Sequence, residues 1–205
     1  MARKGIALVL SAPSGTGKTT LIHKLLGEFP DIKYSISCTT RKPRQGEVNG
    51  KDYHFMSVRD FLLQRDAGAF AEWALVHGNY YATPLKPLQE NLNRGVDVLF
   101  DIDVQGASQL KLNVLTAAFI FILPPSMKEL EQRLRARGTE SEEDIQARLH
   151  NAHDEIKEAC WYDAVVINDD LEVAYSQLRA AYLAATLAPA CHPALISSLL
   201  HSGEN

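Results

Sequence analysis

A glycine-rich segment, Ala12-Pro-Ser-Gly-Thr-Gly-Lys-Thr19, constrains the fold of this chain more than any other feature. It follows an apolar run at residues 6–10 and precedes a stretch of helical character at residues 19–28. Glycines at this spacing let successive backbone N–H groups converge on one point, and the start of the next helix adds positive charge there. The segment therefore predicts a strand, a phosphate-binding loop and a helix in direct succession.

The segment matches the pattern of a nucleoside-triphosphate loop except at its first position, where Ala12 stands in place of glycine. We expect this change to be tolerated because the position requires a small residue more than a positive φ. Lys18 is expected to bridge the β- and γ-phosphates, and the Thr19 hydroxyl to bind Mg²⁺. A plain strand–turn–helix corner with an exposed lysine is the alternative. The residues expected to bind the triphosphate are Ala12, Pro13, Ser14, Gly15, Thr16, Gly17, Lys18 and Thr19.

The rest of the chain alternates short apolar runs with helical stretches, a pattern typical of a parallel α/β sheet with helices on both faces. At about 150 residues per domain, 205 residues predict a single domain with insertions. Together with residues 6–10, the apolar runs predict a five-stranded sheet whose other strands lie at residues 34–38, 96–102, 117–123 and 164–167. A helix before Gly95 is expected to start near Pro87.

Overall charge and composition exclude some classes of partner. The chain has 25 acidic and 21 basic residues, a net charge of −4, which is opposite to the balance of most nucleic-acid-binding proteins. No apolar run approaches the roughly 20 residues of a membrane span. The three cysteines are widely spaced and suggest no disulfide framework. We therefore expect a cytoplasmic protein that binds neither nucleic acid nor membrane.

A local excess of positive charge between residues 33 and 54 indicates a second anion site. This stretch has five Lys or Arg residues and two Asp or Glu residues. Arg41 and Arg44 are spaced so that both can bind one phosphate from two sides. Tyr53 and Tyr81 add hydroxyl donors that stay neutral at pH 7. A solvated basic loop is the alternative, but the phosphate loop upstream favours a second phosphate site.

Glu72 stands in an otherwise apolar stretch, which makes it either a surface residue of an alternating strand or a polar group in a pocket. Guanine offers adjacent N1–H and N2–H donors to one carboxylate, and adenine does not. A pocket with such an acceptor would reject adenine because the carboxylate would remain unpaired. Ser37 and Thr83 are candidate donors to guanine O6.

Several further motifs together resemble the guanylate kinases over about residues 5–185. The similar segments are Ser35-Ile-Ser-Cys-Thr-Thr-Arg-Lys-Pro-Arg44, Gly46-Glu-Val-Asn-Gly50, Gly78-Asn-Tyr-Tyr81, Asp101-Ile-Asp-Val-Gln-Gly106, Arg137-Gly-Thr-Glu140 and Asn168-Asp-Asp170. The resemblance implies the fold of P-loop nucleoside monophosphate kinases, with a five-stranded parallel core, a GMP-binding insertion and a helical lid. The expected core segments are 5–34, 96–125 and 159–188, with the insertion at 35–95, the lid at 126–158 and a helical extension at 189–205.

The resemblance also implies roles for individual residues. The expected readers of guanine are Ser37, Glu72, Thr83 and Asp103, and the expected ligands of the GMP phosphate are Arg41, Arg44, Tyr53 and Tyr81. The lid arginines Arg137 and Arg148 are expected to clamp the ATP phosphates and to act in catalysis with Lys18 and Arg41. Asn168 matches a position near the adenine, and Asp101 is expected to order water bound to Mg²⁺. Cys38 and Ala82 vary within the motifs, but neither change removes a donor.

The implied reaction is ATP + GMP = ADP + GDP, with dGMP as a second acceptor and a role in GTP supply. Two other interpretations remain at this point. A non-catalytic scaffold module of the same family would be expected to lose phosphate-loop residues, whereas Lys18 and Thr19 are present. A kinase for AMP or UMP would not need Glu72. The oligomeric state is open, and residues 190–200 are expected to form an amphipathic helix that packs on the core, with a subunit contact as the alternative.

Overall fold

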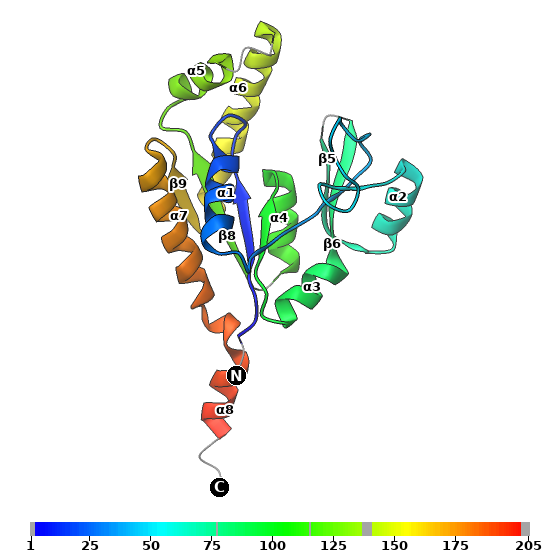
Figure 1. The fold of residues 1–205 in the computed structure, drawn as a ribbon, viewed down its shortest axis with the longest axis vertical. Coiled ribbons are helices and arrows are strands. Elements are labelled where there is room, and N and C mark those ends of the chain that lie inside the picture. Colours follow the sequence, from blue (N-terminus) through cyan, green and yellow to red (C-terminus); the bar gives the residue numbers. More distant parts are fainter. Residues whose placement is uncertain (1–2, 77, 115, 137–140, 202–205) are drawn as a thin grey trace.

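The computed structural model describes residues 3–76, 78–114, 116–136 and 141–201, and a five-stranded sheet lies at its centre (Figure 1). Every neighbouring pair of strands in this sheet is parallel, as predicted. The strand order is β2-β7-β1-β8-β9, with bounds Lys33–Tyr34, Val98–Asp101, Ala7–Ser11, Ala117–Leu123 and Ala164–Ile167.

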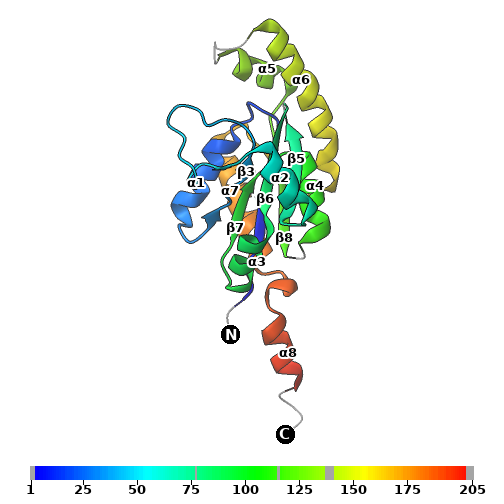
Figure 2. The same ribbon diagram turned by 90° about the vertical axis from the view of Figure 1, so that its right-hand side faces the viewer.

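Helices cover both faces of this sheet because its strands are apolar on both sides. The four helices against it are α1 (Lys18–Glu28), α3 (Leu85–Asn93), α4 (Val104–Asn113) and α7 (Leu171–Thr186). In β1, Leu8 and Leu10 pack with α1 and α7, whereas Ala7 and Val9 pack with α3 and α4. Figure 2 shows α1 and α7 on one side of the sheet and α4 on the other. This enclosed sheet holds the residues at its carboxyl edge in place.

The prediction of one strand at residues 34–38 is wrong. Tyr34 ends β2 of the central sheet, and Cys38 begins β3 (Cys38–Thr39) of a second sheet. Alternating apolar residues are typical of a strand, but they do not show which sheet each residue joins. Here the two ends of the pattern differ, because Tyr34 is 44% exposed and Cys38 is 3% exposed.

The second sheet has four strands in the order β4-β3-β6-β5. The bounds of the other three are His54–Phe55, Asn79–Pro84 and Phe70–Val76. Helix α2 (Val58–Asp66) covers the sheet through Phe61, whose ring stacks on Tyr80 at a centroid distance of 5.0 Å. Ser57 caps the start of this helix, since its hydroxyl accepts the N–H of Asp60 at 3.1 Å. In Figure 1 this sheet stands beside the core.

Helix α3 begins at Leu85, two residues before the predicted start at Pro87. Pro84 is its N-cap residue, and Pro87 is the third residue of the helix. The N–H groups of the first turn have no partner within a helix, so a proline there removes no hydrogen bond. The two prolines therefore fit one helix.

Helices α5 (Met127–Ala136) and α6 (Glu142–Lys157) form the hairpin above the carboxyl edge of the central sheet (Figure 1). Ser126 and Ser141 cap them, because their hydroxyls accept the N–H groups of Glu129 and Asp144. A short 3₁₀ helix, η1 (Glu158–Trp161), then leads back to β9.

The expectation that the C-terminal helix packs on the core is wrong. After η2 (Pro189–Cys191), helix α8 (Pro193–His201) projects away from the central sheet (Figure 1). Leu195, Ile196 and Leu199 of α8 are 47%, 44% and 69% exposed. The alternative, a contact with another subunit, stays a prediction. Among the described residues, none of the helices has the length and apolarity needed to cross a membrane.

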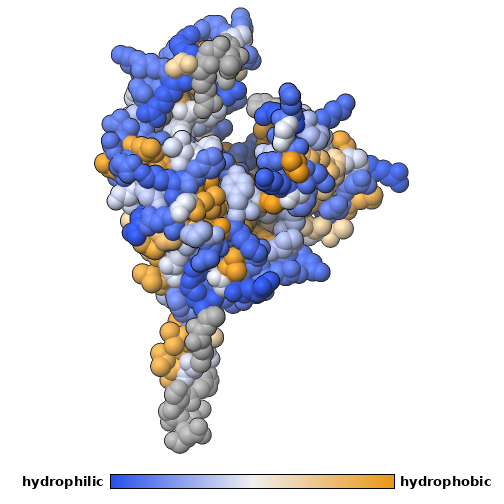
Figure 3. Space-filling model, viewed as in Figure 1, coloured by the Kyte–Doolittle hydropathy of each residue, from blue (hydrophilic) through white to orange (hydrophobic). Residues whose placement is uncertain are grey.

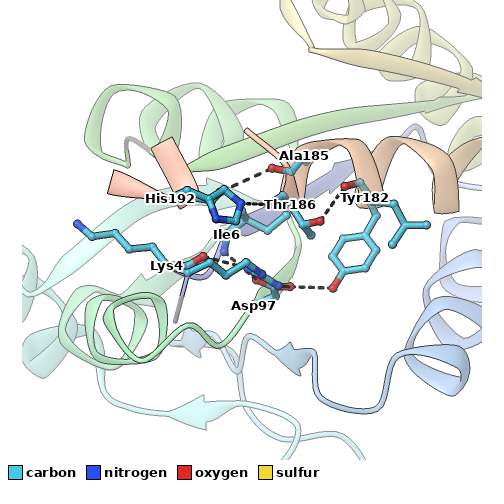
Figure 4. Close-up of polar contacts among 10 residues, drawn as sticks. Lys4, Ile6, Asp97, Tyr182, Ala185, Thr186 and His192 are labelled. Carbon is cyan, nitrogen blue, oxygen red and sulfur yellow. Dashed lines mark hydrogen bonds and ion pairs between the residues drawn. The ribbon is translucent and has the colours of Figure 1, made fainter. Parts of the chain in front are cut away.

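A buried carboxylate ties the start of the chain to the last core helix. Asp97, 4% exposed, accepts hydrogen bonds from the Arg3 guanidinium at 2.7 and 2.8 Å, from the Ile6 N–H at 2.9 Å and from the Tyr182 hydroxyl at 2.7 Å. Figure 4 shows Tyr182 and Asp97 pointing toward each other. Burial raises the pKa of Asp97, but these hydrogen bonds outweigh it, so the net pKa lies below the ordinary value.

We expect Asp97→Ala to lower the free energy of unfolding by about 3 kcal/mol, because it leaves several buried donors unpaired. A lowered pKa means that the stabilisation is complete above the pKa of an unfolded aspartate, about 4, and is lost as the pH falls through the folded value. Urea titrations at neutral and acid pH measure both effects. A loss below about 0.5 kcal/mol at neutral pH would contradict this role.

Candidate active site

The phosphate loop and the end of β7 meet at the carboxyl edge of the central sheet. The register pairs Leu10 of β1 with Asp101 of β7, so the loop after β1 begins beside the end of β7. The Ser11 hydroxyl donates to the carbonyl of Ile102 at 2.8 Å, and Lys18 forms an ion pair with Asp101. Ligands bind at this edge in open parallel sheets, which places the expected triphosphate site where such a fold favours one.

The loop has the conformation that its glycines predict. Gly15 and Gly17 have φ angles of +94° and +90°, in the region that other residues rarely adopt. Helix α1 starts at Lys18, so the unpaired N–H groups of its first turn lie at the loop. Arg148 of α6 donates to the Ser14 hydroxyl at 2.7 Å, which brings an expected lid arginine to the loop.

Of two other expected ATP-site residues, the structure describes only Asn168. Asn168 is buried behind the loop, where its amide nitrogen donates to the Thr16 carbonyl at 2.6 Å. Arg137 and its motif at residues 137–140 lie outside the described residues.

The donors available to Mg²⁺ are few. Thr19 is exposed at the start of α1, and its hydroxyl makes no hydrogen bond within the described part of the chain. Among the same residues, no group of three or more His, Cys, Asp or Glu side chains is arranged to hold a metal ion. One hydroxyl with one nearby carboxylate, Asp101, fits a cation held mainly by substrate phosphates and water, which is how Mg²⁺ is usually bound.

A cleft of about 560 Å³ leads from this edge to the four-stranded sheet. Figure 3 shows the hollow between the two parts of the molecule, with hydrophilic surface around it. The cleft is lined by Asp101 and by seven of the eight side chains expected to bind GMP: Ser37, Arg41, Arg44, Tyr53, Glu72, Tyr81 and Asp103. Thr83, the eighth, contacts Glu72. The fold thus brings together residues from separate parts of the sequence.

Arg41 lies at the end of the cleft expected to hold the GMP phosphate. Its guanidinium donates to both carboxylate oxygens of Glu47, at 2.8 and 3.0 Å, and lies 5.3 Å from the ring centroid of Tyr53. The rings of Tyr53 and Tyr81 are 6.1 Å apart. The hydrogen bond with Arg41 lowers the pKa of Glu47, and the same bond raises the pKa of Arg41.

Glu47 is a site residue that the sequence interpretation did not single out. Its carboxylate also accepts the backbone N–H of Arg44 at 2.7 Å, so it orients both of the arginines expected at the phosphate. The available signal was that Glu47 is one of only two acidic residues in the basic stretch at residues 33–54.

Glu72 lines the same cleft and is 4% exposed. Burial raises the pKa of Glu72 to about 7, although a hydrogen bond from the Thr83 hydroxyl at 2.7 Å opposes the rise. The Thr83 hydroxyl therefore donates its hydrogen bond to Glu72 in this structure, whereas the sequence suggested guanine O6 as its partner. A buried carboxylate with capacity for further donors suits a base that offers two adjacent N–H groups.

Asp103 is another carboxylate that lines this cleft. It is the N-cap residue of α4, where one of its oxygens accepts the N–H of Gly106 at 2.9 Å. The negative charge of Asp103 adds to the rise in the pKa of Glu72. Both acids are thus held by backbone or side-chain donors and face the same part of the cleft.

Known proteins resemble this chain over most of its length. The family model for guanylate kinase matches residues 4–185. The guanylate kinase of Nitratidesulfovibrio vulgaris is 61% identical over 198 residues, which are 97% of this chain and 96% of that protein. That of Geobacter sulfurreducens is 47% identical over 184 residues, 90% of this chain and 91% of that protein.

This chain belongs to the guanylate kinase family. A crystal structure of guanylate kinase from Anaplasma phagocytophilum matches it with a TM-score of 0.73 at 34% identity, covering 93% of this chain and 91% of that one. The predicted family and fold are confirmed, and membership makes the protein a nucleoside monophosphate kinase.

In this guanylate kinase, Gly106 leaves the space that the Glu72 carboxylate occupies. A Cβ at position 106 would lie 2.7 Å from one Glu72 oxygen and 3.3 Å from its carboxyl carbon. We expect Gly106→Ala to displace Glu72 and to raise the KM for GMP about tenfold, while the KM for ATP stays unchanged. The tenfold rise corresponds to the loss of about one hydrogen bond between the substrate and a charged group. Initial rates at varied GMP and ATP measure this. An unchanged KM for GMP would show that the position of Glu72 is unimportant.

Proposed function

We propose that this guanylate kinase transfers the γ-phosphoryl group of ATP to GMP between the phosphate loop and the adjoining cleft. ATP is held by residues 12–19, which include Lys18 and Thr19, with Asn168 directly behind this loop. The guanine is read by Ser37, Glu72, Thr83 and Asp103, and the GMP phosphate is held by Arg41, Arg44, Tyr53 and Tyr81.

One observation carries this proposal. A single cleft extends from Glu72 to Asp101, and the Asp101 carboxylate is paired with Lys18 of the phosphate loop. Arg41 and Arg44 line the same cleft. An acceptor phosphate at these arginines and a donor triphosphate at the loop would therefore face each other, which is the alignment that phosphoryl transfer requires.

The proposed chemistry needs no general base because the acceptor oxygen of GMP is already anionic. This oxygen attacks the γ-phosphorus of ATP, and a new P–O bond forms. The bond from that phosphorus to the β–γ bridging oxygen breaks, and its electron pair stays on ADP. Lys18, Arg41 and Arg148 neutralise the charge that moves. Arg137 is assigned the same role from its motif. Lys18 exchanges its contact with Asp101 for phosphate oxygens when ATP binds.

Mg²⁺ is the cofactor in this proposal, and when bound it neutralises charge on the β- and γ-phosphates. The Thr19 hydroxyl would hold it directly, and Asp101 would hold it through a bound water. Both residues are available beside the loop. Thr19 is exposed, and Asp101 forms an ion pair with Lys18, which ATP also attracts.

We also assign the insertion at residues 35–95 and the lid at residues 126–158 to two units that close over the substrates. The Arg148 contact with Ser14 supports this assignment, because it joins the lid helix to the loop through exposed side chains. Closure would exclude water, which otherwise competes with GMP as the acceptor.

Release of ADP with GMP, dGMP, AMP and UMP as acceptors tests the proposal. We expect GMP and dGMP to be used, because the eight residues are assigned to the base or the phosphate and none is assigned to the sugar. AMP and UMP should be used less well by a factor of about 10³ or more, because they leave buried acceptors unpaired. Use of AMP at a rate similar to GMP would contradict the assignment.

A further inference from the structure

The side chain of Asn168 is fixed on several sides directly behind the phosphate loop. It follows β9 and is 7% exposed. Its backbone N–H donates to the Leu123 carbonyl at 2.8 Å, and its own carbonyl accepts Arg133 of α5 at 3.0 Å. The amide nitrogen of its side chain donates to the Thr16 carbonyl at 2.6 Å. An amide held in this way has a defined direction.

The loop touches Asn168 at its most closely packed point. A Cβ added to Gly17 would lie 2.4 Å from the Asn168 amide nitrogen, closer than real contacts allow. A Cβ added to Gly15 would meet Leu134 and Leu130 of α5, at 2.9 and 3.2 Å. Gly15 therefore packs against α5, and Gly17 packs against the Asn168 side chain.

Peptide geometry links this contact to phosphate binding. The Thr16 carbonyl and the Gly17 N–H belong to one trans peptide unit, so they point in opposite directions. A donor that holds the carbonyl from behind therefore aims the N–H to the other side of the loop. The Gly17 N–H makes no hydrogen bond within the described part of the chain. Backbone N–H groups of such loops are the groups that bind phosphate.

We propose that Asn168 is a positioning residue for the phosphate loop, whose side-chain amide fixes the Thr16–Gly17 peptide so that the Gly17 N–H faces the phosphates of ATP. This inference rests on the proposed binding of ATP at residues 12–19. It assigns the amide nitrogen of Asn168 to the loop and not to the adenine. Arg133 holds the Asn168 carbonyl and so joins α5 to the same support.

A ligand without a base separates this role from contact with adenine. The probe is inorganic tripolyphosphate with Mg²⁺, compared with ATP, and the dissociation constants are measured by calorimetry for wild type, Asn168→Ala and Asn168→Asp. We expect Asn168→Ala to weaken both ligands by the same factor, about fivefold to tenfold, the worth of one hydrogen bond. Asn168→Asp should weaken both further, because a carboxylate oxygen would face the Thr16 carbonyl. This variant keeps the side-chain volume and carries the test if the alanine variant does not fold.

Asn113 offers a matched control. Its amide nitrogen donates to the Ala71 carbonyl at 3.0 Å, the same type of bond in a part of the molecule away from the loop. Asn113→Ala should change the stability of the fold but leave both dissociation constants unchanged. The affinity for GMP should be unchanged in the Asn168 variants, since Asn168 does not line the GMP cleft.

The remaining outcomes would overturn the proposal in distinguishable ways. Weaker ATP binding with unchanged tripolyphosphate binding would show that Asn168 reads the adenine instead. Unchanged binding of both ligands would show that the amide does not position the loop, while the function of the loop would stand. A wild-type protein that binds neither ligand would overturn the proposed function together with this inference.

Discussion

Replacing Lys18 with alanine is expected to lower kcat for GDP formation by at least about 10³-fold while the fold persists. One uncharged oxyanion donor contributes about 10²–10³ in kcat, and a lysine adds a full positive charge where negative charge moves. The Lys18 side chain is 18% exposed and its ammonium group is already paired with Asp101, so it is held at the point where the triphosphate is proposed to bind. Single-turnover kinetics with ATP and GMP measure the loss.

Lys24, on the same helix, gives the matched control for this substitution. Its ammonium group pairs with Glu172 and lies 5.1 Å from the centroid of the Tyr175 ring, away from the loop. Lys24→Ala should change kcat by less than about twofold, because exposed pairs contribute little. Normal turnover by a folded Lys18→Ala protein would show that the loop is not the site of ATP chemistry.

Glu72→Gln is expected to lower kcat/KM for GMP by about 10³-fold and to leave the KM for ATP unchanged. The amide keeps the shape of the side chain but presents N–H donors to a base that offers N–H donors itself. A site that binds its substrate through buried hydrogen bonds disfavours a substrate that cannot form them by a factor of about 10⁴ or more. We expect a smaller loss here because Asp103 still interacts with the base. Initial rates at varied GMP measure the change.

The pH dependence of GMP use supplies the control for Glu72. Binding requires the ionised carboxylate, and burial raises its pKa to about 7 in the protein without GMP. The wild-type KM for GMP should therefore rise as the pH falls below about 7. Well below the pKa of Glu72, the rise should approach about tenfold per pH unit. The phosphate of GMP titrates near pH 6 and should remain visible in the Glu72→Gln profile. If both proteins gave the same profile, Glu72 would not be the reader of guanine.

The central fold could be predicted because its signals are local. The glycine spacing at residues 12–19 and the apolar strands at residues 117–123 and 164–167 each depend on near neighbours in the sequence, and all of them match the structure. The failures concern relations between distant segments. Alternation at residues 34–38 gave no information on which sheet each end joins, and the apolar face of α8 gave none on its partner.

The candidate site shows the same division. Arg41 and Glu72 could be singled out from the sequence because a guanidinium binds phosphate and a carboxylate accepts the adjacent N–H donors of guanine. Glu47 and the buried amide of Asn168 act through other residues, Arg41 and Thr16, and only the folded chain shows these contacts. The close approach of Gly106 to Glu72 joins segments that are far apart in sequence, so a single sequence has no signal for it.

The most direct test is a crystal structure of the protein with GMP, Mg²⁺ and a non-hydrolysable ATP analogue. We expect carboxylate oxygens of Glu72 within about 3.2 Å of N1 and N2 of guanine, and Arg41 and Arg44 at the GMP phosphate. We also expect the γ-phosphate at Lys18, in line with the acceptor oxygen. A guanine bound away from Glu72, or a triphosphate bound away from residues 12–19, would show that the proposed site is wrong.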